Sequence, residues 1–162
     1  MSTPPPRLRS TGPVDLAVPF IVIGVAAYVL LRVTWASLPP LGWLAPAPLA
    51  VLAVAEIVAA RRVRAAVRHD PDARPMAAIV IARCVALGKA SSLVGAGVAG
   101  AAVALLARLL PDSGTVSAAA HDARVSALLL GSAVLAVVGG LLLERAGIDP
   151  NNDERNPGDR GR

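Results

Sequence analysis

The sequence predicts an all-α fold, a polytopic transmembrane four-helix bundle between two disordered tails. Hydrophobic residues make up 55% of the 162-residue chain, and its mean hydropathy is +0.61. These residues come in four long blocks and not at the periodic positions of a soluble helix or strand. As a helix, a block of about 20 residues spans a ~30 Å hydrocarbon layer. We therefore expect a transmembrane domain over residues 14–146, with spans at about 16–36, 44–60, 83–108 and 125–143.

The first block is the uncharged run from Leu16 to Leu31, which continues past Arg32 to Trp35. Residues 1–13 before it are rich in proline and arginine and have little to bury, so we expect a disordered cytoplasmic tail. The segment Thr34-Trp35-Ala36 loosely resembles the small-x-small cleavage site of a signal peptide. Arg32 and Trp35 fit such a site poorly and three more apolar blocks follow, so the pattern favours an uncleaved first span.

The connection from Leu38 to Trp43 contains two prolines and a glycine, which end the first helix and permit a turn. A second span follows from about Leu44 to Ala60, with Pro46 and Pro48 in its first turns, where a missing amide donor costs least. The next loop gathers arginines, at Arg61, Arg62, Arg64, Arg68 and Arg74. Such a run could bind nucleic acid, but directly after an apolar span it indicates a cytoplasmic loop against anionic lipid headgroups. We expect no nucleic-acid partner.

The third block lies at the centre of the chain. Eighteen uncharged residues, Ala90 to Ala107, stand between Lys89 and Arg108. The whole apolar segment from Met76 to Leu110 would be roughly 52 Å long as a helix, at a rise of ~1.5 Å per residue. Because this exceeds the hydrocarbon thickness, one end of the helix must leave the apolar layer. We place its edges at Arg83 and Arg108.

Basic residues beside the spans predict the orientation. A polar connector over residues 111–123 leads to the fourth span, Val125 to Leu143, and a second disordered tail covers residues 147–162. In this layout eleven arginines fall on the side of both termini and two on the other. The eleven are Arg7, Arg9, Arg61, Arg62, Arg64, Arg68, Arg74, Arg145, Arg155, Arg160 and Arg162, against Arg108 and Arg124. The positive-inside rule then places both termini in the cytoplasm and the protein in the inner, or plasma, membrane.

Small residues spaced four apart predict close helix packing. Two stripes lie in the third block and a matching one in the fourth span: Ser91, Gly95 and Ala99; Ser92, Ala96 and Gly100; Ser132, Ala136 and Gly140. Such residues let helix backbones approach in a membrane, so we expect these two helices to pack on each other. The run Gly95 to Gly100 also matches the dinucleotide-binding fingerprint, but that motif needs a preceding strand in a water-exposed unit. We expect no cofactor.

Three charged residues, Glu56, Arg83 and Lys89, lie within or at the edges of apolar blocks. At ~1.5 Å per residue Glu56 is about 7.5 Å from the basic edge at Arg61, and Lys89 is about 9 Å from Arg83. Since a lone charge in hydrocarbon is costly and the depths match, we expect a Glu56–Lys89 ion pair that locks two antiparallel helices. The alternative is a proton or ion relay, or a ligand site. Arg83 is the second choice of partner for Glu56.

Other residue types that could carry chemistry are isolated in the sequence. His69 and His121 lie in different loops without a second ligand at metal-binding spacing, and Cys84 is the only cysteine. The serines Ser91 and Ser92 are expected to bond to helix carbonyls or across to a neighbouring helix. We therefore expect no metal site, no disulfide within the chain and no enzymatic activity.

A family resemblance rests on Leu38-Pro39-Pro40, Glu56, Arg83, the run Ala86-Leu87-Gly88-Lys89-Ala90-Ser91, and Gly95. Over about residues 16–145 the chain resembles an actinobacterial family of small four-span integral membrane proteins of unknown function, often encoded beside folate-biosynthesis genes. The resemblance implies a membrane protein and assigns no catalytic residue.

These observations predict a small scaffold or accessory subunit of a membrane complex. Its expected partners are the lipid bilayer and a membrane protein, or further copies of itself. The alternative is a minimal transporter or channel-forming oligomer that uses Glu56, Arg83 and Lys89 as its polar pathway.

Overall fold

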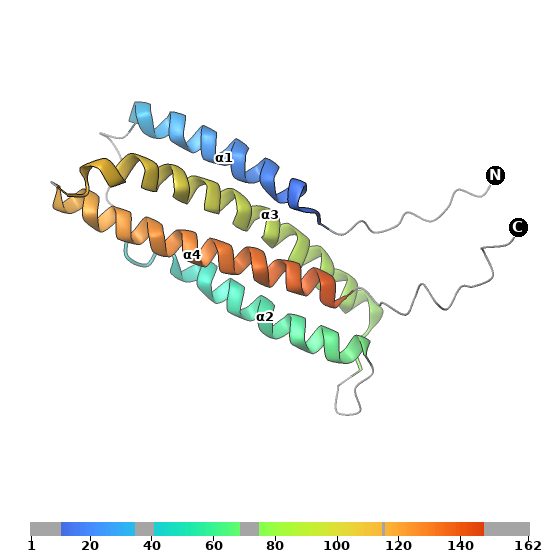
Figure 1. The fold of residues 1–162 in the computed structure, drawn as a ribbon. Coiled ribbons are helices and arrows are strands. Elements are labelled where there is room, and N and C mark those ends of the chain that lie inside the picture. The colour runs from blue at the N-terminus through green and yellow to red at the C-terminus, as the bar shows by residue number, and fades with distance from the viewer. Residues whose placement is uncertain (1–10, 35–40, 69–74, 115, 148–162) are drawn as a thin grey trace, which may run out of the picture.

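The computed structural model describes residues 11–34, 41–68, 75–114 and 116–147. Within these ranges the chain forms four long α-helices and one short 3-10 helix (Figure 1). They are α1 (Pro13–Thr34), α2 (Ala47–Val67), α3 (Ala78–Leu109), η2 (Leu110–Asp112) and α4 (Ser117–Ala146). The prediction of an all-α fold with four helices is confirmed for the part of the chain that the structure covers.

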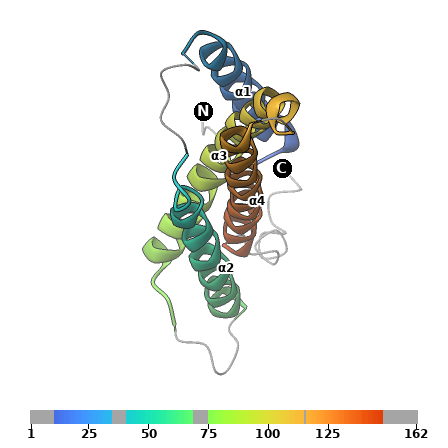
Figure 2. The ribbon, with the colours of Figure 1, turned by 90° about the vertical axis from the view of Figure 1, so that its left-hand side faces the viewer.

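The four helices lie in a row in the order α1, α3, α4, α2, and not around one common axis (Figures 1 and 2). Helix α1 packs on α3, α3 packs on α4, and α4 packs on α2, whereas α2 and α3 touch only slightly. The reason lies in where the small residues are. Helices α3 and α4 bury glycine, alanine and serine along their length, while in α1 Leu31 is the one buried residue. Close approach of helix backbones is therefore concentrated on the two central helices.

Three of the helices are long and apolar enough to cross a membrane: α1, α3 together with η2, and α4. Helix α2 is 21 residues long but is not among them, because Glu56 and the three arginines in its last turns make it too charged. Its apolar part, Ala47 to Ala60, is about 21 Å long at ~1.5 Å per residue, which is shorter than a ~30 Å hydrocarbon layer. The prediction of a membrane protein is thus supported, but the structure does not confirm a fourth span.

Two helix ends differ from the expectation at the arginine-rich end of the molecule. Helix α1 begins at Pro13, and Thr11 before it is buried with its backbone N–H donating to Oε1 of Glu144 at 2.7 Å. Residues 11–13, expected in a tail, are therefore part of the packed domain. Helix α2 continues through three arginines of the expected loop, because arginine favours helix and a cation near a helix C-terminus is stabilised by the macrodipole. The rest of both tails lies outside the described residues.

At the opposite end the expected connector over residues 111–123 is mostly helical. Helix α4 begins at Ser117, and η2 extends the third helix to Asp112, whose carboxylate pairs with Arg108 at 2.9 Å. The alanines after Ser117 are strong helix formers, which explains the earlier start. Asp122 belongs to this helix and is buried, and its Oδ1 accepts a hydrogen bond from the backbone N–H of Leu41 at 3.1 Å.

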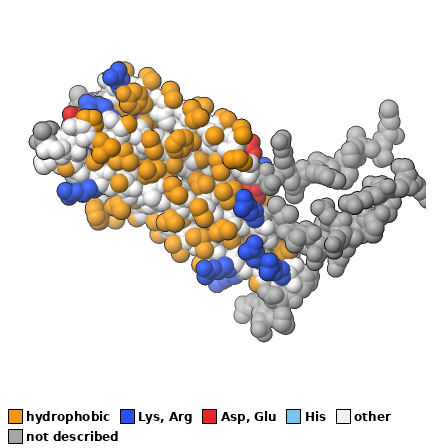
Figure 3. All heavy atoms as spheres, viewed as in Figure 1, with side chains coloured by type: hydrophobic (Ala, Val, Ile, Leu, Met, Phe, Trp, Pro, Cys, Tyr) orange, Lys and Arg blue, Asp and Glu red, His pale blue; other side chains and the backbone are white. Residues whose placement is uncertain are grey.

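The contacts give the directions of the helices: α3 and α4 run antiparallel, whereas α1 runs parallel to α3 and α2 runs parallel to α4 (Figure 1). One end joins Thr11 to Glu144 and holds an apolar cluster formed by Ala60, Val63, Leu143 and Ala146. The other end joins Leu41 to Asp122 and packs Leu109 on Ala119 and Ala123. Hydrophobic side chains cover the middle of the surface in Figure 3, and lysine and arginine side chains lie towards its ends. This distribution is typical of a protein surrounded by lipid.

Candidate functional site

The most unusual polar side chain in the described structure is that of Glu56 on α2. It is 2% exposed and is one of the largest fully buried side chains. It faces α4 at Gly139, where an added Cβ atom would lie 3.2 Å from Oε2 of Glu56 and 3.1 Å from the carbonyl oxygen of Ala53. The missing side chain of Gly139 thus provides the space that the carboxyl group occupies.

A hydroxyl group from a third helix lies beside this carboxyl. Ser91 of α3 is 7% exposed, and its side chain is adjacent to that of Glu56. Its Oγ donates within its own helix, to the carbonyl oxygen of Leu87 at 3.0 Å or of Gly88 at 3.2 Å. Neither carboxyl oxygen of Glu56 has a hydrogen-bond partner among the residues that the structure describes. Three helices therefore enclose the carboxyl group, and no counter-ion from the described ranges reaches it.

The two neighbouring glycines Gly139 and Gly140 have different roles in α4. Gly139 faces Glu56 and Ala53 on α2, whereas Gly140 faces Gly88 on α3. A Cβ atom on Gly140 would lie 2.5 Å from the carbonyl oxygen of Gly88, and one on Gly88 would lie 2.6 Å from that of Gly140. Since real Cβ atoms do not come so close, α3 and α4 meet here backbone to backbone. The double glycine brings α2, α3 and α4 together around Glu56.

The nine small residues expected at helix contacts are all buried. They do not share one partner helix. Gly95 of α3 packs on Ala133 and Val137 of α4, whereas Gly100 packs against the backbone of Phe20 and Gly24 of α1. The small surface of α3 therefore serves two neighbours, α4 along one side and α1 along the other.

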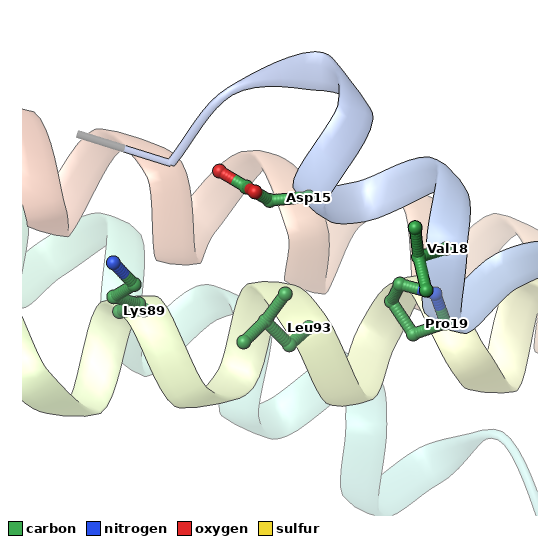
Figure 4. Close-up of a pocket in the computed structure, with 5 residues that line it drawn as sticks. All are labelled: Asp15, Val18, Pro19, Lys89 and Leu93. Carbon is green, nitrogen blue, oxygen red and sulfur yellow. The ribbon is translucent and has the colours of Figure 1, made fainter. Parts of the chain in front are cut away.

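Lys89 does not join Glu56. Its side chain is exposed and lines a pocket between α1 and α3 together with Asp15, Val18, Pro19 and Leu93. Figure 4 shows Lys89 pointing to the side on which Asp15 of α1 lies. Residues two apart on a helix point in different directions, so Lys89 and the buried Ser91 occupy different faces of α3. Arg83, the second choice of partner, is also exposed. The structure does not bring the three expected charges together, because matched depth does not fix the direction around the helix axis.

Sequence analysis missed two buried carboxylates, Glu144 and Asp122. Glu144 is 3% exposed, and its Oε1 accepts the N–H of Thr11 while no partner for Oε2 is found in the described part. A signal was available for Glu144, because it continues the stripe of Ser132, Ala136 and Gly140 by one further step of four residues. For Asp122 the signal was its place in a helical run that was interpreted as a connector.

The structure offers no metal-binding cluster within the residues that it describes, since no three His, Cys, Asp or Glu side chains gather there. His121 is exposed on α4, and Cys84 is a partly buried free thiol near the apolar cluster of Ala60 and Leu143. His69 lies outside the described ranges. The site is thus a carboxyl and a hydroxyl group enclosed by three helices.

Comparison with known proteins gives one match. The model of a family described as "Protein of unknown function (DUF3180)" matches residues 16–150, which includes nearly all of the four helices. No curated protein and no solved structure matches the chain.

Proposed function

We propose that this chain, which belongs to the DUF3180 family of proteins of unknown function, is a four-span membrane protein that acts as a small scaffold or accessory subunit of a membrane complex. It is not an enzyme in this proposal. Three helices of membrane-spanning length support its placement in a membrane. The expected actinobacterial origin and the neighbouring folate-biosynthesis genes stay predictions.

The fourth span in this proposal is α2. Its packing along α4, through Ala53, Glu56, Ala60 and Val63, supports a position at the same depth as the other helices. Its outward side chains Val51, Val54 and Val58 are exposed and apolar, as lipid-facing residues are. The arginines in its last turns can extend their charged groups to the membrane surface and contact anionic headgroups. With this span both termini lie on the arginine-rich, cytoplasmic side of the inner membrane.

The observation that carries the scaffold role is the exposure of α1. Among the described helices α1 packs extensively only on α3, and only 6% of its most apolar stretch is buried. Val22, Val25 and Val29 on its outer side are 57–61% exposed. A row of helices leaves its outermost member free to pack on another protein within the membrane. Because this surface is apolar throughout, we expect its partner to be a transmembrane helix of another membrane protein.

Site-specific photo-crosslinking in native membranes tests this role. A photoreactive amino acid replaces Val22 on α1 in one variant and Val134 on the outer side of α4 in a matched control; both valines are about half exposed or more, at 61% and 49%. We expect a single discrete protein adduct from the α1 position and only lipid adducts from the α4 position. Lipid adducts from both positions would contradict the proposal. An adduct with the mass of two copies would replace the accessory role with a homo-oligomer.

A transporter or channel-forming oligomer is the second candidate function. The buried and unpartnered Glu56 favours it, because intramembrane carboxyl groups often serve in ion or proton pathways. The exposed positions of Arg83 and Lys89 do not support a pathway that uses all three residues. Reconstituted vesicles that show ion or proton flux dependent on Glu56 would favour this candidate over the scaffold.

A further inference from the structure

The surroundings of Glu56 do not suit an ionised carboxylate. Its oxygens lack hydrogen-bond partners in the described structure, and the side chain is 2% exposed. Removing a carboxylate from water without a partner is far more costly than removing the neutral acid, so such groups take up a proton. No cationic side chain of the packed helices compensates the charge, since the described ones on α2, α3 and α4 point outward or pair elsewhere. They are Arg61, Arg62, Arg64, Arg68, Arg83, Lys89, Arg108, Arg124 and Arg145.

Other titratable groups on the packed helices do not neutralise Glu56 either. Glu144 on α4 is itself an acid, which cannot serve as a counter-ion, and it accepts the N–H of Thr11. The Cys84 thiol on α3 is partly buried beside Ala60 and Leu143. His121 is exposed, and Asp112 and Asp122 are engaged with Arg108 and with the N–H of Leu41 at the far end of the molecule.

The orientation of Ser91 matches a protonated carboxyl group. Its hydroxyl hydrogen is directed to a helix carbonyl, of Leu87 or Gly88, so the lone pairs of Oγ are open to a donor. A carboxylic acid has one O–H donor, whereas a carboxylate can only accept. An ionised Glu56 would instead require the Ser91 hydroxyl to rotate away from its own helix.

We propose that Glu56 and Ser91 form a proton-binding site between α2, α3 and α4. In the packed protein Glu56 holds the proton, and its O–H can turn to donate to Oγ of the adjacent Ser91. On release the proton passes to water, the carboxyl group becomes a carboxylate, and the Ser91 hydroxyl turns from the helix carbonyl to donate to it. No bond other than O–H breaks or forms. The site is independent of a partner at α1, so failure of the crosslinking experiment does not affect it.

Carbodiimide labelling of the full-length protein in lipid nanodiscs tests the site. Dicyclohexylcarbodiimide is apolar and reacts with protonated carboxyl groups: the acid proton moves to a nitrogen of the reagent, the carboxyl oxygen adds to its central carbon, and rearrangement leaves a stable acylurea. We expect Glu56 to be labelled at neutral pH and labelling to fall as the pH rises. Glu56→Gln is the control, because it removes the carboxyl group and should leave no label at position 56.

A pair of serine variants separates proton binding from simple burial. Ser91→Ala removes a hydrogen-bond partner from both forms of Glu56, and the ionised form loses more, because a charge-assisted hydrogen bond is roughly twice as strong as a neutral one. Half-labelling of Glu56 should therefore move to higher pH. Ser92→Ala is the matched control, since Ser92 is equally buried on the same helix and bonds only to its own backbone at the carbonyl of Lys89 in the described structure. Its labelling profile should equal that of the wild type.

Infrared spectroscopy of the full-length protein gives a second, independent measurement of the protonation of Glu56. The carbonyl band of a protonated carboxyl group should be present at neutral pH and disappear on the same pH scale as labelling, and Glu56→Gln should lack it. Absence of both the band and the label in folded protein would overturn the proposal. Equally fast labelling of Glu56 by a water-soluble carbodiimide would overturn it as well.

Discussion

Gly88 of α3 and Gly140 of α4 pack backbone against backbone, so closely that a Cβ atom on either would lie within 2.6 Å of the other's carbonyl oxygen. This contact fixes the distance between the two central helices. It also holds Ser91, which would lie 2.9 Å from a Cβ on Gly140, beside the carboxyl group of Glu56. The Gly88–Gly140 contact is therefore the point at which helix packing and the candidate site depend on each other.

Substitution of Gly140 tests this contact. We expect Gly140→Ala to destabilise the protein by about 1–3 kcal/mol, because α3 must move away and overpacking of a tight interface costs about that much. Gly131→Ala on the same helix is the matched control, since an added Cβ there has nothing within 4 Å. The control should be neutral or slightly stabilising. Thermal unfolding in detergent measures both, and equal effects would refute the packing account.

Two glycines of α3 should report on different neighbours. The larger side chain in Gly95→Leu would push α3 away from Ala133 and Val137 of α4. In Gly100→Leu it would push α3 away from Phe20 and Gly24 of α1. Both changes should lower thermal stability in detergent, whereas Leu105→Met, at a half-buried position, should be mild. Cysteine crosslinking between α1 and α3 should be lost in Gly100→Leu and retained in Gly95→Leu. Retention in both variants would contradict the assignment of the two faces.

Glu56 and Lys89 should behave as independent residues. Because one is buried against α4 and the other lies at the α1 side of α3, the effects of Glu56→Gln and Lys89→Met on the free energy of unfolding should add within about 0.5 kcal/mol. A double-mutant cycle in detergent measures the coupling. If one change rescued the stability lost through the other, that result would contradict independence and would support the ion pair expected from their matched depth.

The sequence predicts the helices, and the faces of them that carry small residues, better than it predicts how the helices are arranged in space. Apolar blocks and spacings of four identify the long helices and the stripe through Ser132, Ala136 and Gly140, since both follow from the helical repeat. The order of the helices in the row could not be predicted in this way, because it depends on which face of each helix packs on which neighbour. Depth along the axis places Lys89 in the first half of α3 but gives no direction around the helix.

The site shows the same limit. Glu56 was recognisable because a charge within an apolar block is rare and costly. The surroundings of Glu56 could not be predicted, because Gly139 and Ser91 come from helices that are distant in sequence and meet only in the packed structure. Asp122 and Glu144 accept hydrogen bonds from backbone N–H groups, and no side-chain pattern in the sequence reveals such partners.

The central claim, that α2 is a fourth membrane span, is tested most directly by reporter fusions on its two sides. An enzyme that is active only outside the cytoplasm is fused after Gly42 and after Asp70, with fusions after Ser113 and Asn152 reporting on the remaining helices. Because eleven arginines lie on the side of both termini and two on the other, we expect activity after Gly42 and Ser113 and none after Asp70 and Asn152. The same activity state after Gly42 and Asp70 would show that α2 does not cross the membrane and would contradict the four-span account.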